Sequence, residues 1–193
     1  MSRRASCEGR AVKSLVLGGV RSGKSRYAAE LARAEVYPVT LIATARILDE
    51  EMAARIEAHR VSRPSDWLVV EEPTRLAAAL IAHSSPTRTV IVDCLTLWLT
   101  NLLCGEDRQA LARESALLLD IFPTLSGPCV LVSNEVGFGI TPVNALARRF
   151  ADEAGTLHQK LAAMCDCVVL MAAGLPLRVK PSDVRPHGQA GLA

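Results

Sequence analysis

The feature that most constrains this chain is the glycine-rich stretch GGVRSGKS at residues 18–25. An apolar run at residues 15–17 precedes it, and a helix-forming run at residues 26–33 follows it. A strand, a glycine turn ending in Lys-Ser and then a helix is the context in which a P-loop binds nucleotide phosphates. The pattern therefore predicts a P-loop at the start of an α/β fold.

Each residue type in this motif has a chemical reason. Gly18 and Gly23 allow backbone N–H groups to turn inward around phosphate oxygens, and the start of the helix adds partial positive charge. Lys24 brings a full charge to the β- and γ-phosphates, and the Ser25 hydroxyl is a potential ligand of Mg²⁺. We therefore expect nucleotide to be bound by the whole loop, which consists of Gly18, Gly19, Val20, Arg21, Ser22, Gly23, Lys24 and Ser25.

Continuous apolar runs alternate with helical patterns along the rest of the chain. Further strands are predicted at residues 39–43, 67–70, 89–93, 129–133 and 167–171. Helices are predicted at residues 49–62, 74–83 (with Thr74 as N-cap), 97–103, 108–119 and 144–164. This alternation predicts a mostly parallel sheet flanked by helices. We expect a single domain over residues 14–180, with flexible tails at residues 1–13 and 181–193.

Composition excludes several classes of protein. The net charge of the 193 residues is +2, with both signs interspersed, and aromatic residues make up 4%. Such a chain has neither the basic patch nor the stacking platform of a nucleic-acid-binding protein. It has no apolar run of membrane-spanning length, and its six cysteines form no Cys-x-x-Cys pair. We therefore expect a cytoplasmic protein with reduced, mostly buried thiols.

Two further sites extend the nucleotide hypothesis. Asp93 ends an apolar strand, where a carboxylate can hold the hydrated Mg²⁺ of a P-loop enzyme. Arg55, His59 and Arg63 are spaced by four residues and so share one helix face. Like charge disfavours the imidazolium form, which leaves His59 a neutral nucleophile between guanidiniums that bind phosphate. From spacing alone, a solvated basic helix face remains the alternative.

Five segments, in order, carry a resemblance to a known family. They are the P-loop, IATA at residues 42–45, RIEAHRVSRP at residues 55–64 with Trp67, VDCLT through NLL at residues 92–103, and SNEVGFGI at residues 133–140. From about residue 15 to residue 180 the chain resembles the bifunctional adenosylcobinamide kinase/adenosylcobinamide-phosphate guanylyltransferase family. The His-Arg-x-x-Arg-Pro and Asn-Glu-Val-Gly-x-Gly segments are the specific part of this resemblance.

The resemblance implies a RecA-like P-loop fold, a homotrimer and two reactions in cobalamin biosynthesis. Adenosylcobinamide is phosphorylated by ATP or GTP, and GMP from GTP then passes through a histidine to the corrinoid phosphate. His59 matches that histidine, and Lys24 is its catalytic partner at the phosphates. The resemblance also implies nucleotide contacts outside the P-loop at Ala43, Thr44, Ala45, Arg60, Val61, Ser62, Arg63, Glu71 (to guanine) and Asp93.

Three positions depart from the family pattern, namely Val143, Ala151 and His158. Two other interpretations stay open. The chain could be a small-molecule kinase without guanylyltransferase activity, in which His59 would be dispensable. It could instead be a nucleotide-responsive binding module, although the Asn-Lys-x-Asp guanine loop of GTPase switches does not occur at residues 133–136.

Overall fold

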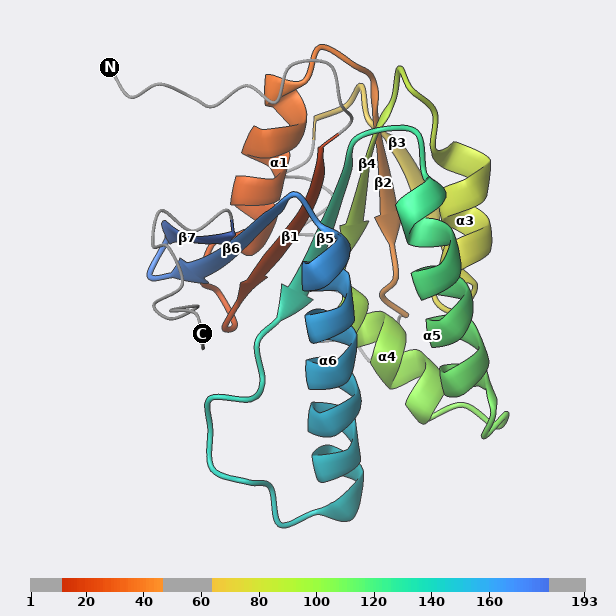
Figure 1. Cartoon of the computed structure of the whole chain (residues 1–193), viewed down its shortest axis with the longest axis vertical. Helices are drawn as coiled ribbons and strands as arrows, with labels where there is room; N and C mark the ends of the chain where they lie inside the picture. Colours follow the sequence, from red (N-terminus) through yellow and green to blue (C-terminus); the bar gives the residue numbers. More distant parts are fainter. Residues whose placement is uncertain (1–11, 47–63, 181–193) are drawn as a thin grey trace, which may run out of the picture.

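The computed structural model describes residues 12–46 and 64–180. In this part of the chain, seven strands form one sheet in the order β3-β2-β4-β5-β1-β6-β7 (Figure 1). All neighbouring strands are parallel except β6 and β7, which are antiparallel. The strands are β1 (Lys13–Gly18), β2 (Val39–Ala43), β3 (Leu68–Glu71), β4 (Thr89–Asp93), β5 (Cys129–Asn134), β6 (Cys167–Ala172) and β7 (Leu175–Lys180).

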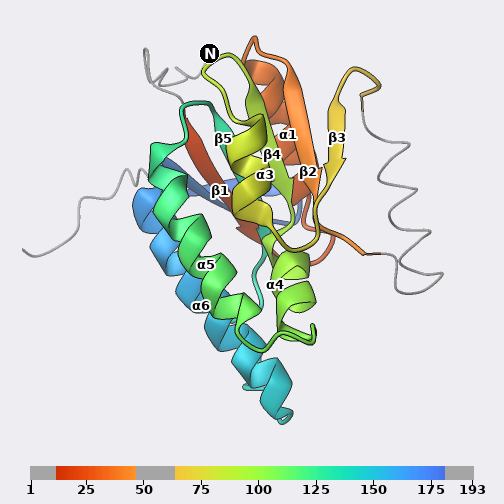
Figure 2. The same cartoon turned by 90° about the vertical axis from the view of Figure 1, so that its right-hand side faces the viewer.

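Helices cover both faces of the sheet, and this confirms the predicted fold class. Figures 1 and 2 show α1 on one side of the sheet and the other α-helices on the opposite side. The helices are α1 (Lys24–Ala34), α3 (Leu76–His83), α4 (Leu95–Leu103), α5 (Ala110–Ile121) and α6 (Ala145–Met164), with a short 3-10 helix η1 (Phe122–Thr124).

The apolar runs in the strands are unbroken because alternate residues pack into two different cores, one on each face of the sheet. In β1, Leu15 packs with α3, α4, α5 and α6, whereas Val16 packs with Ala28 and Ala32 of α1. In β5, Leu131 and Val130 divide in the same way. Successive side chains of a strand point to opposite faces, so a sheet covered on both sides needs apolar residues at every position.

The boundaries of several elements match the sequence prediction. β2 and β4 span the predicted residues, and α6 begins at Ala145 with Asn144 as its N-cap. The Asn144 Oδ1 accepts hydrogen bonds from the N–H groups of Leu146 and Ala147 at 2.8 and 3.2 Å. A side-chain oxygen at this position satisfies N–H groups that have no partner inside the helix.

The prediction that Thr74 caps a helix was wrong. α3 begins at Leu76, and Arg75 occupies the N-cap position without a side-chain hydrogen bond. The Oε1 atom of Glu72 instead accepts hydrogen bonds from the N–H groups of Thr74 and Arg75, at 3.0 and 2.8 Å. The Thr74 hydroxyl also donates to Glu72 Oε1, at 3.4 Å, so it is engaged in the turn before α3 and does not cap the helix.

Strand β7 was not predicted, and the last predicted strand was residues 167–171. The sequence of β7, LPLRVK, has no unbroken apolar run, and nearly all of its residues are exposed. The strand pairs with β6 through a tight turn in which Ala173 and Gly174 have φ angles of 50° and 81°. Pro176 lies inside β7, which an edge strand tolerates because one side of it makes no ladder hydrogen bonds. The N–H of Gly174 donates to the carbonyl of Ser22 at 3.0 Å, so this hairpin supports the P-loop.

Lys13 was placed in the N-terminal tail, but it lies in β1 and is 7% exposed. Its N–H donates to Asp166 Oδ2 at 2.9 Å, and its Nζ donates to the carbonyl of Pro123 at 2.7 Å. A lysine in the sequence suggests an exposed position. Lys13 is buried nevertheless, because the methylene groups of a lysine can pack in the core while its ammonium group bonds to a carbonyl. Of the two predicted tails, residues 1–11 and residues 181–193 lie outside the described residues.

Five cysteines lie within the described residues, and all five are free thiols. Cys94, Cys129 and Cys165 are buried as predicted, whereas Cys104 is exposed. Burial raises the pKa of the Cys165 thiol to about 12, so this thiol is protonated at neutral pH. No helix of residues 12–46 and 64–180 has the length and apolarity needed to cross a membrane.

Candidate active site

The carboxyl ends of the parallel strands meet at one edge of the sheet. The strand register places Gly18 beside Asn134, and Ala43 between Asp93 and Glu71. Four predicted nucleotide-contact regions therefore come together at this edge, because neighbouring parallel strands end at the same level. They are the P-loop, residues 43–45, Glu71 and Asp93. Parallel α/β sheets bind their ligands at this edge.

The P-loop connects β1 to α1 and contains two glycines with positive φ angles. Gly18 has a φ of 149°, and a Cβ atom there would lie 2.5 Å from the carbonyl oxygen of Met171. Gly23 has a φ of 95° and occupies the N-cap position of α1. Both positions therefore require glycine, which is the physical reason for the spacing seen in the sequence.

Lys24 lies in the first turn of α1 and is 8% exposed. Its Nζ donates a hydrogen bond to the carbonyl of Gly19 at 2.6 Å, which places the ammonium group inside the turn of the loop. Burial lowers the pKa of Lys24 below its usual value, while Cys94 and Asp93 act in the opposite direction. The P-loop thus contains one buried positive charge, Lys24, besides the exposed Arg21.

Ser25 and Asp93 fit the requirements of a Mg²⁺ site. Both are half-buried, at the start of α1 and at the end of β4. Among residues 12–46 and 64–180, neither side chain has a hydrogen-bond or ion-pair partner. A hydroxyl and a carboxylate are oxygen ligands of the kind that Mg²⁺ prefers, together with water and phosphate oxygens.

Thr44 follows β2 and is completely buried. Its hydroxyl donates to the carbonyl of Cys94 at 2.7 Å and accepts from the Cys94 N–H at 2.9 Å. Its own N–H donates to the carbonyl of Asp93 at 3.2 Å. These polar groups are occupied by the chain itself and hold the ends of β2 and β4 together, so the nucleotide contact of Thr44 stays a prediction.

Helix α4 contributes polar residues that the sequence analysis did not assign. The Asn101 amide donates to the carbonyls of Thr44 and Pro73 at 2.8 and 3.0 Å. The Trp98 indole donates to the carbonyl of Thr74 at 2.7 Å. A signal that could have revealed Asn101 is an amide in a mostly apolar helix, because a buried polar side chain needs a partner.

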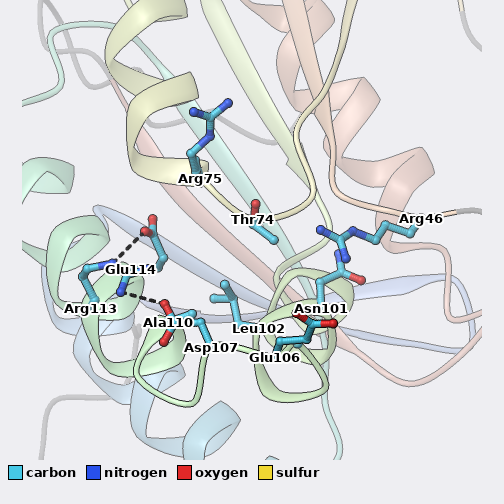
Figure 3. A pocket seen from close by; sticks show the side chains of 11 residues that line it. Arg46, Thr74, Arg75, Asn101, Leu102, Glu106, Asp107, Ala110, Arg113 and Glu114 are labelled. Atoms are coloured by element: carbon cyan, nitrogen blue, oxygen red, sulfur yellow. Dashed lines mark hydrogen bonds and ion pairs between the residues drawn. The ribbon is translucent and has the colours of Figure 1, made fainter.

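A cavity of about 410 Å³ opens next to this helix, between α4, α5 and the start of α3 (Figure 3). Figure 3 shows Arg46 directed toward Asn101, with Arg113 on the opposite wall. Arg113 forms ion pairs with Asp107 at 3.0 Å and Glu114 at 3.5 Å. The walls therefore offer both hydrogen-bond donors and acceptors, which suits a polar ligand better than an apolar one.

Of the other predicted nucleotide contacts, some lie within the described residues and some lie outside them. Glu71 is exposed at the end of the edge strand β3, and Val20 and Arg21 are exposed in the P-loop. Ala43 and Ala45 are half-buried on either side of Thr44. The remaining predicted residues, including the nucleophile, lie outside the described residues: Arg55, His59, Arg60, Val61, Ser62 and Arg63.

His158, one of the departures from the family pattern, lies in α6 and packs against β5. It is 6% exposed, and its Nε2 is 2.7 Å from the hydroxyl of Ser133 in β5. Burial lowers the pKa of His158 below its ordinary value of 6.5, with Glu135 opposing the change. The side chain therefore acts as a neutral hydrogen-bonding group rather than as a charge.

We expect His158→Asn to make the protein less sensitive to acid. As pH falls through 6.5 the unfolded state binds a proton that the native state does not, so the contribution of this histidine to stability decreases until pH falls below the lowered native pKa, where the decrease ends. Each unit of difference between folded and unfolded pKa is worth about 1.4 kcal/mol. Urea unfolding at about pH 7.5 and about pH 5.5 measures the effect. His83→Asn is the control, and parallel curves for wild type and His158→Asn would contradict this prediction.

The fold and the site together define the class of the protein. A parallel sheet with a P-loop between β1 and α1, and a carboxylate at the end of β4, is the arrangement of P-loop nucleoside-triphosphate enzymes. The sequence model of the family described as cobinamide kinase / cobinamide phosphate guanyltransferase matches residues 14–179. The chain belongs to this family.

Curated relatives agree with this assignment. A bifunctional adenosylcobalamin biosynthesis protein, CobP of Pseudomonas aeruginosa, is 48% identical over 169 residues, which cover 88% of this chain and 98% of the relative. Proteins called CobU in Escherichia coli and Salmonella typhimurium are 41% and 40% identical over 179 residues, covering 86% of this chain and 98% of each relative. The predicted enzyme class, a bifunctional kinase and guanylyltransferase of cobalamin biosynthesis, is thereby confirmed.

A solved structure from Pyrococcus horikoshii OT3 gives a TM-score of 0.47 at 9% identity, covering 88% of this chain and 86% of the other. This likeness is too weak to support an argument about the site.

Proposed function

We propose that the protein phosphorylates adenosylcobinamide with ATP or GTP and then transfers GMP from GTP to the product through His59. The final product is adenosylcobinamide-GDP. The observation that carries the proposal is the meeting of the P-loop with Thr44, Glu71 and Asp93 at one sheet edge, in a chain that the family model matches over residues 14–179.

The two-step transfer balances at each stage. A ring nitrogen of His59 attacks the α-phosphorus of GTP, the bond to the β-phosphate oxygen breaks, and pyrophosphate leaves. A phosphate oxygen of the phosphorylated corrinoid then attacks the same phosphorus and releases the imidazole. Lys24 stabilises the charge that develops on the β- and γ-phosphates. Ser25 and Asp93 would hold Mg²⁺, which supplies further neutralisation of the phosphate oxygens.

Selection of the guanine base is assigned to Glu71. A carboxylate accepts hydrogen bonds from the N1–H and the exocyclic amine of guanine, a pattern of donors that adenine does not offer. Glu71 is exposed at the end of β3, where its side chain is accessible to a ligand. Backbone and side-chain contacts to the nucleotide are assigned to Ala43, Thr44, Ala45, Arg60, Val61, Ser62 and Arg63.

Incubation with Mg²⁺ and GTP labelled at the α-phosphate tests this mechanism. A histidine phosphoramidate is acid-labile and base-stable, so label with these properties on the wild-type chain is expected. Absence of such label would reject the guanylyl-histidine. If adenosylcobinamide phosphate still formed, the protein would be a kinase alone, and if no turnover occurred, it would be a binding module.

The proposal includes a cytoplasmic homotrimer. Its support is an exposed apolar surface in the loop before α6, where Phe138, Ile140 and Val143 are 81%, 97% and 97% exposed, and in the first turn of that helix, where Leu146 is 51% exposed. Figure 1 shows this loop and the start of α6 extending past the carboxyl ends of the strands. Exposed apolar surface of this kind is typical of a protein–protein contact. Light scattering of the purified protein measures the number of subunits.

A further inference from the structure

Helix α4 carries a buried amide that binds two loops at once. Asn101 is 9% exposed, and its Nδ2 donates to the carbonyl of Thr44 at 2.8 Å and to that of Pro73 at 3.0 Å. Because both partners are carbonyl oxygens, only the NH₂ group can face them, and this fixes the orientation of the amide. Both N–H bonds of one side chain therefore hold the loop after β2 against the loop after β3.

These two loops flank predicted nucleotide contacts. Thr44 lies between Ala43 and Ala45, and Pro73 follows two residues after Glu71. β3 is an edge strand that pairs with β2 alone. Within the described residues, the last backbone bond between the two segments runs from the Glu72 N–H to the carbonyl of Ala43 at 3.0 Å. The Asn101 amide is the next link between them.

We propose that Asn101 is a positioning residue, which sets the place of Glu71 relative to the rest of the nucleotide site by joining Thr44 to Pro73. The inference rests on the proposed function, because it assigns guanine to Glu71. Removal of the amide leaves the buried Thr44 carbonyl and the part-buried Pro73 carbonyl without this donor, so the link between the two loops beyond the Glu72–Ala43 bond is lost. Among the described residues, Asn101 bonds to Thr44 and Pro73 and not to the P-loop, so binding of the phosphates is expected to persist.

The test compares two substitutions at this position with a control on the same helix. Asn101→Leu removes the amide, and Asn101→Asp keeps the shape and polarity but loses both donors at neutral pH. Thr100→Val removes a different donor of α4, a hydroxyl bonded within the helix to the carbonyl of Thr96 at 2.9 Å, and leaves the link between the two loops intact. Circular dichroism establishes that each variant is folded.

Two measurements then report on the nucleotide. Calorimetry gives the Kd of non-hydrolysable GTP and ATP analogues, and the labelling assay gives kcat/KM for guanylylation of the protein. Both Asn101 variants are expected to lose about 10- to 100-fold in kcat/KM for GTP and in affinity for the GTP analogue, as small misplacements of a binding group do. Affinity for the ATP analogue and all values for Thr100→Val are expected to stay close to wild type.

A double-mutant cycle with Glu71→Ala completes the test. If Asn101 acts through Glu71, the two substitutions together cost little more than Glu71→Ala alone. Additive losses, equal losses of the GTP and ATP analogues, or values that match Thr100→Val would each overturn the positioning role. Failure of the wild-type chain to take up label would instead reject the proposed function, so the two failures are distinguishable.

Discussion

The His59→Ala variant is expected to take up no acid-labile label from GTP, whereas it continues to phosphorylate adenosylcobinamide. A methyl group cannot attack phosphorus, so the covalent step has no nucleophile. Loss of the nucleophile in covalent enzymes costs about 10⁶-fold in kcat, and a loss of at least about 10⁴-fold in formation of adenosylcobinamide-GDP is expected here. The kinase step needs only the P-loop residues, and its rate is expected to stay within a few-fold of wild type.

Mass spectrometry separates the two products and so measures both steps in one reaction. His83→Ala, which removes a half-buried histidine at the end of α3, is the matched control and should retain both activities. Continued formation of adenosylcobinamide-GDP by His59→Ala at more than a few per cent of the wild-type rate would show that another group carries the guanylyl unit. The kinase activity of the variant shows in the same sample that it is folded.

Lys24→Met is expected to lower both activities, which distinguishes it from His59→Ala. Methionine fills nearly the same volume but removes the buried ammonium group and its bond to the Gly19 carbonyl. Both reactions develop charge on phosphate oxygens that this ammonium stabilises. Loss of one such preorganised donor costs about 10²- to 10³-fold in kcat, and we expect a decrease of that size in each step.

The control for Lys24→Met is Lys160→Met, which removes an exposed lysine of α6. Thermal unfolding of both variants tests whether the loss is local, because the P-loop substitution should leave the core of the sheet intact. A Lys24→Met protein with either activity near the wild-type level would contradict the role assigned to this residue. Selective loss of only the guanylyl step would contradict a single phosphate-binding loop for both reactions.

Local sequence patterns were sufficient where a structural feature depends on neighbouring residues. The P-loop, the strands β2 and β4, and the helix α6 follow from short-range chemistry: glycines at positive φ, unbroken apolar runs and an amphipathic pattern. The same patterns failed for β7 and for Thr74. A strand at the edge of a sheet carries a weak apolar signal, and the Thr74 hydroxyl bonds to the Glu72 carboxylate instead of capping α3.

The sequence by itself determined the fold class, the P-loop and the family, because each is encoded in contiguous residues whose order is enough to specify them. Only the tertiary structure showed that Asn101 joins Thr44 to Pro73, that His158 bonds to Ser133, and that Gly174 supports the P-loop. These contacts link residues between 25 and 152 positions apart (158 − 133 and 174 − 22). Hydrogen bonds over such separations depend on how helices pack on the sheet, and no local pattern in one sequence specifies that packing.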